Sequence, residues 1–155
     1  MEKLESIFKN SLFVSNICVH ADSHHNDLIA LIFPNKKYCE EFAEKNGIPV
    51  RTLFLMIYCN SMIGDLLGQA ADWASLCKDE KLKEAILKDL QREGQKTQLR
   101  SMEMISAVLL YPDEWTPEND WLTSAMKLRR FDIKIKQKAA VEEAYVILEK
   151  KQKGQ

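Results

Sequence analysis

The 155-residue sequence has none of the features of a membrane-spanning or secreted protein. Its longest apolar run covers residues 53–59, whereas a membrane-spanning helix needs about 20 apolar residues. No basic and apolar leader opens the sequence, and its four cysteines include no C-x-x-C pair. We therefore expect an intracellular protein that is not secreted and that keeps its thiols reduced.

Phosphate-binding motifs and an excess of charge of one sign are also absent from the sequence. The formal net charge is −1, so no overall basic surplus favours a nucleic acid partner. None of the patterns G-x-x-x-x-G-K-[ST], G-x-G-x-x-G and G-x-S-x-G occurs. If the chain takes part in chemistry, we expect most of the active site to lie outside it.

What the sequence does contain fits one small domain of the α/β (α+β) class. Apolar residues make up 46% of the chain and charged residues 29%, and a chain of this length can bury one core. The expected helices and strands follow from the spacing of apolar residues. Helices are predicted over 2–10, 36–46, 78–94 and 131–151, and strands over 13–21, 28–33 and 104–111. We expect a three-stranded sheet flanked by helices, in a single domain spanning residues 1–155.

Individual residues add local detail to this prediction. The polar turn 22–27 makes the first two strands a β-hairpin. The second strand is apolar at both parities, so both of its faces should be covered. Gly47 and Gly94 are placed to end the second and third helices. The apolar side of the last helix is expected to be formed by Ile135, Ala139 and Val146.

Histidines and acidic residues cluster around the hairpin turn. The cluster comprises Cys18, His20, Asp22, His24, His25 and Asp27. A metal ion would need three or four of these side chains to converge, and the tip of a turn rarely closes such a site. We interpret the cluster as an exposed polar turn and predict no metal site, with metal binding as the weakest alternative.

The segment 123–130, TSAMKLRR, combines small residues with one lysine and two arginines. Small residues let the backbone approach a ligand closely, and Lys127 could then reach a phosphate or carboxylate oxygen. Arg129 and Arg130 could hold anions, or could pair with acidic side chains that precede them. Those acidic side chains are Asp113, Glu114, Glu118 and Asp120. Composition alone favours a plainer interpretation, a solvated basic start of a helix.

The C-terminal part of the sequence is locally basic. Residues 127–153 carry nine Lys and Arg against four Asp and Glu. Such an excess allows a phosphate-rich or membrane-surface partner. A charged, solvent-exposed terminal helix is the more common reason for it.

Five segments carry a specific resemblance to a known family. Near the start these are 2–11 (EKLESIFKNS), 13–22 (FVSNICVHAD) and 31–35 (LIFPN), and near the end 114–119 (EWTPEN) and 122–130 (LTSAMKLRR). In order and spacing they resemble the C-terminal domain of eukaryotic long-chain fatty acyl-CoA synthetases, which belong to the adenylate-forming enzymes. The resemblance covers nearly the whole chain.

The resemblance implies a small lid domain that works with a large N-terminal domain absent from this chain. The whole enzyme would use ATP, Mg²⁺, CoA and a long-chain fatty acid, whereas this fragment would bind no cofactor and would be inactive alone. Lys127 would be the catalytic lid lysine, and Thr123, Ser124, Arg129 and Arg130 are candidates for the loop that contacts the nucleotide. The expected location is the cytoplasm, or the surface of the endoplasmic reticulum or another organelle membrane.

The sequence also departs from the family that it resembles. The family usually has glycine at the position of Asp120, a smaller apolar residue at that of Trp121, and often glutamine at that of Met126. We expect the carboxylate of Asp120 to weaken the attraction of Lys127 for ATP. Residues 51–63 have no counterpart and are predicted to be an insert, with a genuine apolar helix that covers the sheet as the alternative. The hinge that would precede Glu2 is missing. The alternative function is a non-catalytic, lid-derived module that binds a protein partner or a membrane surface.

Overall fold

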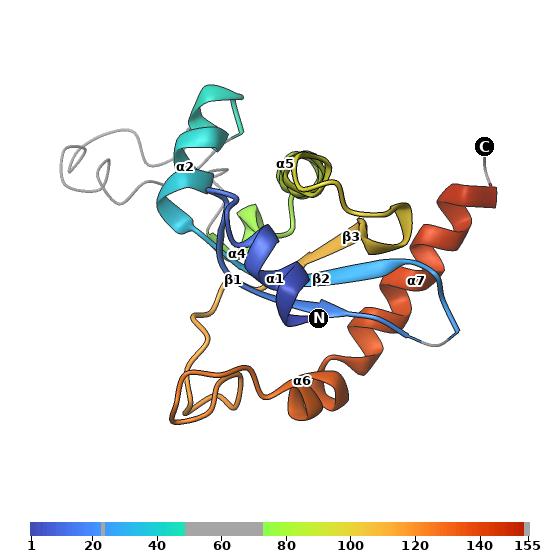
Figure 1. Ribbon diagram of the computed structural model, residues 1–155. Coiled ribbons are helices and arrows are strands. Elements are labelled where there is room, and N and C mark those ends of the chain that lie inside the picture. Colours follow the sequence, from blue (N-terminus) through green and yellow to red (C-terminus); the bar gives the residue numbers. More distant parts are fainter. Residues whose placement is uncertain (23, 49–72, 154–155) are drawn as a thin grey trace.

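The computed structural model describes residues 1–22, 24–48 and 73–153, so the predicted insert at 51–63 lies outside the described residues. A three-stranded sheet lies at its centre (Figure 1). The strands are β1 (Val14–His20), β2 (Leu28–Pro34) and β3 (Ile105–Leu110), in the order β1-β2-β3. β1 and β2 are antiparallel, which confirms the predicted hairpin, whereas β2 and β3 are parallel.

Helices cover both faces of this sheet (Figure 1). One face packs against α1 (Glu2–Phe8), α2 (Lys36–Lys45), the short α4 (Trp73–Leu76) and α5 (Glu80–Lys96). The other face packs against α6 (Arg130–Lys136), α7 (Lys138–Lys153) and the connection that precedes α6. A 3₁₀ turn, η1 (Ser101–Glu103), leads into β3. Among the described helices, none combines the length and the apolar character that crossing a bilayer requires.

β2 separates two apolar clusters because its side chains alternate between the faces of the sheet. Leu28, Ala30 and Ile32 point into the first cluster, and Ile29 and Leu31 into the second. All five are at most 7% exposed, so the prediction that both faces of this strand are covered is confirmed. Burial of each large side chain contributes roughly 1.5–3 kcal/mol.

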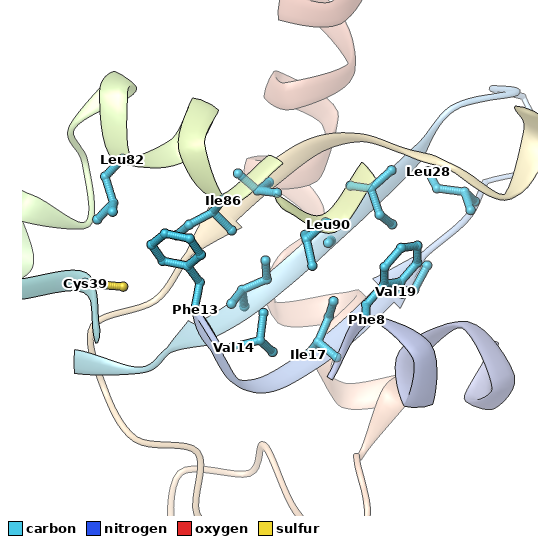
Figure 2. Close-up of a cluster of buried hydrophobic side chains, with 14 of the residues drawn as sticks. Phe8, Phe13, Val14, Ile17, Val19, Leu28, Cys39, Leu82, Ile86 and Leu90 are labelled. Atoms are coloured by element: carbon cyan, nitrogen blue, oxygen red, sulfur yellow. The ribbon is translucent and has the colours of Figure 1, made fainter. Parts of the chain in front are cut away.

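The first cluster joins segments that are far apart in the sequence (Figure 2). Phe8 of α1 and Ile17 of β1 meet the apolar side of α5, from which Leu82, Ile86 and Leu90 project at four-residue spacing. All five side chains are fully buried. The helix predicted over 78–94 therefore packs into the first cluster with the apolar side that its four-residue period predicts.

The two glycines that were expected to end helices behave differently. Gly47 has φ +66° and follows α2, and the N–H of Ile48 donates to the carbonyl of Ala43 at 2.8 Å, which closes the helix as predicted. Gly94 was predicted to end α5, and this is wrong, because the helix continues to Lys96. Gly94 instead makes room for a neighbour, since a Cβ atom there would lie 2.8 Å from the Sδ atom of Met104.

The last predicted helix is two helices, and its predicted apolar side is wrong. The helix breaks at Gln137, whose Oε1 accepts a hydrogen bond from the Tyr111 hydroxyl at 2.8 Å. The break interrupts the helical period, so a single apolar stripe cannot be continued from α6 into α7. The predicted side chains Ile135, Ala139 and Val146 are exposed, whereas the buried ones are Ile133, Val141, Ala144 and Tyr145.

The buried thiols make stability depend on pH in the alkaline range. Burial raises the pKa of Cys39 to about 12 and that of Cys77 to about 12. Between pH 9 and pH 12 the unfolded chain loses these protons and the folded chain keeps them, so the free energy of unfolding falls as pH rises. Replacing both residues by alanine should make this decline shallower by about 1–2 kcal/mol per pH unit. Urea unfolding at pH 8 and pH 10.5 tests this, and an unchanged slope in the double variant would contradict it.

Candidate functional site

Residues 122–128 form a tight hairpin, called here the lysine loop. Leu122 and Leu128 pair as an isolated antiparallel bridge at its base. The N–H of Thr123 donates to the carbonyl of Lys127 at 2.7 Å, and the N–H of Met126 donates to the carbonyl of Thr123 at 2.8 Å. The N–H of Lys127 in turn donates to Oγ1 of Thr123 at 3.2 Å. The backbone and the hydroxyl of Thr123 thus hold the loop closed through hydrogen bonds to Met126 and Lys127.

Lys127 stands at the end of this loop with its side chain exposed to solvent, as does Ser124 at the tip. In the part of the chain that the structure describes, no ion pair includes Lys127. Its ammonium group is a flexible point charge with three donors, presented on a closed hairpin. A charge presented in this way can contact an anionic ligand that another domain holds.

An aromatic cluster anchors the base of the lysine loop. Trp115 is 2% exposed and stacks on Trp121, with ring centroids 4.3 Å apart and planes 8° from parallel. Tyr111 meets the ring of Trp121 edge-on at 4.9 Å. Buried Leu122 belongs to the same apolar cluster on this side of the sheet. Stacked rings of this size fix the orientation of the chain just before the loop.

The connection that precedes the loop is held by its own side chains. Oδ1 of Asn119 accepts from the N–H of Thr116 at 2.9 Å, and Nδ2 of Asn119 donates to the carbonyl of Glu114 at 2.7 Å. These bonds fold the acidic segment into a local turn, as its prolines and polar residues suggest. Neither Asp113 nor Glu114 is paired with Arg129 or Arg130 within the described residues.

Asp120 has a left-handed backbone and a carboxylate bound to two cations. Its φ is +63°, a conformation that glycine adopts most easily and that Asp tolerates. Oδ1 lies 2.5 Å from Nη1 of Arg129, and Oδ2 lies 2.6 Å from Nζ of Lys136. Lys136 and then Arg129 hold the pKa of this carboxyl below its usual range. The negative charge that was expected to weaken the attraction of Lys127 for ATP is therefore matched by two positive charges.

Both arginines after the loop are engaged inside the chain. Nε of Arg129 lies 2.6 Å from Oδ2 of Asp132, in addition to the contact of Arg129 with Asp120. Arg130 makes two parallel hydrogen bonds to Glu5, at 2.7 and 2.6 Å, and Glu5 also accepts the N–H of Val19 at 2.8 Å. The guanidinium groups of Arg129 and Arg130 thus hold carboxylates of this chain.

Glu5 is a residue that the sequence analysis missed. It is 6% exposed, although it is charged and lies in a seven-residue helix. Glu5 lies next to Leu4 and one turn before Phe8, within the apolar side of α1. This position in the sequence could have identified it as a buried acidic residue. Its partner could not be found in the same way, because Arg130 is 125 residues away.

The turn between β1 and β2, which carries the histidines, packs against α7. His25 stacks on Tyr145 with centroids 4.0 Å apart and planes 10° from parallel. The Tyr145 hydroxyl donates to the carbonyl of Asp27 at 3.2 Å, and Asp27 accepts from the Ser106 hydroxyl at 2.6 Å. Burial, followed by Lys134, lowers the pKa of His20. Within residues 1–22, 24–48 and 73–153, no group of three or more His, Cys, Asp or Glu side chains could hold a metal ion.

Known ligases match this chain along nearly its whole length, although no protein-family model does. It is 32% identical over 145 residues to long-chain-fatty-acid–CoA ligase 4 of Saccharomyces cerevisiae and 34% identical over 146 residues to long-chain-fatty-acid–CoA ligase 1 of Schizosaccharomyces pombe. With ligase 6 of Homo sapiens it shares 30% identity. Each match covers 94% of this chain, but the chain spans only 18–19% of the length of these relatives.

The fold is also found in solved structures of adenylation domains. The A-PCP didomain of a carboxylic acid reductase from Segniliparus rugosus, in complex with AMP, has a TM-score of 0.68 and 22% identity. That likeness covers 99% of this chain and 17% of the reductase chain. The adenylation domain of the reductase from Mycobacterium chelonae has a TM-score of 0.67 and 21% identity, with 94% and 17% of the two chains covered. At such identities the likeness shows a shared fold.

Proposed function

This chain is a relative of the adenylate-forming long-chain-fatty-acid–CoA ligases over less than a fifth of their length, and we propose that it is the C-terminal lid of such a ligase. The lid would work with a separate part of the enzyme that holds ATP and the fatty acid. The chain alone has no phosphate-binding loop, so by itself it forms no acyl-CoA. Cytoplasmic enzymes and enzymes bound peripherally to an organelle membrane both fit this role.

The proposed reaction has two steps that use the lid differently. In the first, an oxygen of the fatty acid carboxylate attacks the α-phosphorus of ATP, and pyrophosphate leaves. Lys127 would stabilise the negative charge that is shared between the carboxylate and the α-phosphate. In the second, the lid rotates and withdraws Lys127, and the CoA thiol attacks the acyl-adenylate carbonyl, so that AMP leaves.

The observation that carries this proposal is the contrast between Lys127 and the two arginines that follow it. Arg129 and Arg130 hold carboxylates of the chain itself, whereas Lys127 is exposed and in no ion pair with the described residues. Thr123 would shape the loop through its backbone and hydroxyl contacts. Ser124, exposed at the loop tip, is the remaining candidate for contact with the nucleotide.

Mg²⁺ would be bound elsewhere in the complete enzyme. It prefers carboxylate and phosphate oxygens in octahedral geometry. The described residues bring together no group of side chains of the kind that holds a metal ion. In the proposed enzyme the metal would therefore be held by ATP and by the part that binds it, where it neutralises phosphate charge.

A chimeric enzyme tests the proposal. The segment of S. cerevisiae ligase 4 that matches this chain is replaced by residues 1–155, and a second chimera lacks residues 51–63. We expect at least one of them to form long-chain acyl-CoA from ATP, CoA and fatty acid, whereas the truncated ligase and the isolated chain do not. Folded chimeras that are no more active than the truncated ligase would contradict the proposal.

A second candidate function is a lid-derived module that binds an anionic membrane surface. Phe131 is 76% exposed and Ile135 is 59% exposed, and Lys134 and Lys138 lie beside them along the same groove. Apolar side chains flanked by lysines are typical of contacts with lipid headgroups. Flotation with anionic vesicles distinguishes the two functions, because a module of this kind would bind vesicles and leave both chimeras inactive.

A further inference from the structure

The stems of the lysine loop continue beyond the bridge between Leu122 and Leu128. The N–H of Arg129 donates to the carbonyl of Trp121 at 3.0 Å, which extends the hairpin by one step. One residue further out, the side chains of Asp120 and Arg129 join across the same two stems at 2.5 Å. The ion pair is therefore the outermost cross-link of the hairpin that carries Lys127.

Lys136 ties this cross-link to the next element. It lies in the last turn of α6, sixteen residues after Asp120, and reaches back to Oδ2 at 2.6 Å. Asp120 thus receives one cation from the stem that leaves the loop and another from α6. Because the left-handed backbone at Asp120 turns the chain sharply, the carboxylate can reach both cations.

We expect these ion pairs to order the lysine loop locally and to add little to the free energy of unfolding of the domain. The side chain of Asp120 is 45% exposed, that of Arg129 38% and that of Lys136 51%, and ion pairs between such exposed side chains add little to the free energy of unfolding. Arg129 and Lys136 are the charged groups found against Asp120 in the described residues, and Arg129 also binds Asp132. Their loss should therefore change the order of the loop without unfolding the chain.

We propose that Asp120 is a positioning residue for Lys127: its carboxylate joins both stems of the lysine loop to α6 and sets the direction in which the Lys127 ammonium is presented. The ordering of the loop is a property of this chain alone. Its effect on catalysis rests on the proposed function of Lys127. Because Asp120 acts through its ion pairs with Lys136 and Arg129, the ordering of the loop should weaken as ionic strength rises.

The substitution Asp120→Asn tests the ordering with little effect on the backbone, because asparagine tolerates a positive φ as well as aspartate does. We expect hydrogen exchange at the amides of Thr123, Lys127 and Arg129 to become about two- to tenfold faster, as the loss of one or two exposed ion pairs allows. Exchange at amides in the centre of β2, such as that of Ile32, should not change. High salt should produce the same increase at the loop amides of the unaltered chain.

Asp132→Asn is the matched control, because it removes a carboxylate from Arg129 but leaves Asp120 bound to both cations. It should leave exchange at Thr123 and Lys127 unchanged. The proposal is overturned if Asp120→Asn exchanges like the unaltered chain, or if Asp132→Asn accelerates exchange in the loop to the same extent.

The active chimera tests the catalytic consequence. Asp120→Asn should lower kcat for acyl-adenylate formation by about two- to tenfold and leave the KM for ATP unchanged, since the nucleotide is held elsewhere. Asp120→Glu, which keeps the charge, should recover part of the loss. If Lys127→Ala abolishes activity while Asp120→Asn does not lower kcat, the positioning role is wrong and the proposed function stands. If neither substitution matters, the proposed function fails, and the exchange measurement still decides whether Asp120 orders the loop.

Discussion

Lys127→Ala in the active chimera should lower the rate of acyl-adenylate formation by about 10²–10³-fold, the effect of losing one preorganised electrostatic contact to a charged transition state. In the proposed function the ammonium group acts where negative charge is shared between carboxylate and phosphate, and alanine would leave that charge without its partner. The exposed position of Lys127 means that the substitution removes no buried contact. Release of pyrophosphate from ATP and fatty acid measures the loss directly.

The second half of the reaction provides the internal control. With preformed acyl-adenylate and CoA as substrates, Lys127→Ala should form acyl-CoA at nearly the unaltered rate, because the lid has by then withdrawn the lysine. Lys134→Ala removes an exposed positive charge on α6, outside the lysine loop, and should leave both steps unchanged. A Lys127→Ala chimera that forms acyl-adenylate at the unaltered rate would refute the catalytic role.

Arg130→Met should destabilise the isolated chain by about 2–3 kcal/mol, the largest stability effect that we expect from a single charged residue. In this variant Glu5 would stay buried but lose both hydrogen bonds from Arg130. Of the donors found for Glu5 in the described residues, the Val19 N–H would remain. Removing one partner of a buried pair costs about 3–5 kcal/mol, and we expect a smaller loss here because the side chain of Arg130 is 35% exposed. Urea unfolding followed by circular dichroism measures the change.

Arg92→Met is the matched control for this prediction. Arg92 pairs with Asp89 one turn earlier on α5, and its side chain is 66% exposed. The side chain of Asp89 is only 10% exposed, but it keeps the hydrogen bond from the Ser11 hydroxyl when Arg92 is replaced. An ion pair with a solvent-exposed arginine contributes about 0–1 kcal/mol, so the control variant should stay close to the unaltered chain. Equal losses in the two variants would show that the Glu5–Arg130 pair is no more than a surface contact.

The sequence predicts those parts of the fold that depend on near neighbours in the chain. Alternation in 28–33 and the four-residue period of Leu82, Ile86 and Leu90 describe local faces, and both features are found in the structure. The break at Gln137 is different, because it involves a bond from Tyr111 on another element. No period within 131–151 contains that information, and both sides of the segment carry apolar residues.

In the candidate site, too, features that depend on near neighbours in the chain differ from those that depend on distant contacts. The resemblance drew attention to Lys127 and the segment around it, but it did not predict the hairpin that residues 122–128 form. The ion pairs of Asp120 with Arg129 and Lys136 depend on a left-handed backbone that composition does not reveal. The Glu5–Arg130 pair joins α1 and α6, which pack on opposite faces of the sheet, so only the assembled sheet brings the two side chains together.

The long span of the Glu5–Arg130 pair has a consequence for the order in which the chain assembles. During synthesis, Glu5 of α1 leaves the ribosome 125 residues before its partner Arg130 of α6. Until then Glu5 can be buried only without its guanidinium partner, and this weakens the packing of α1 against the sheet. We therefore expect the packing of α1 against the sheet to reach its full stability only after α6 has formed.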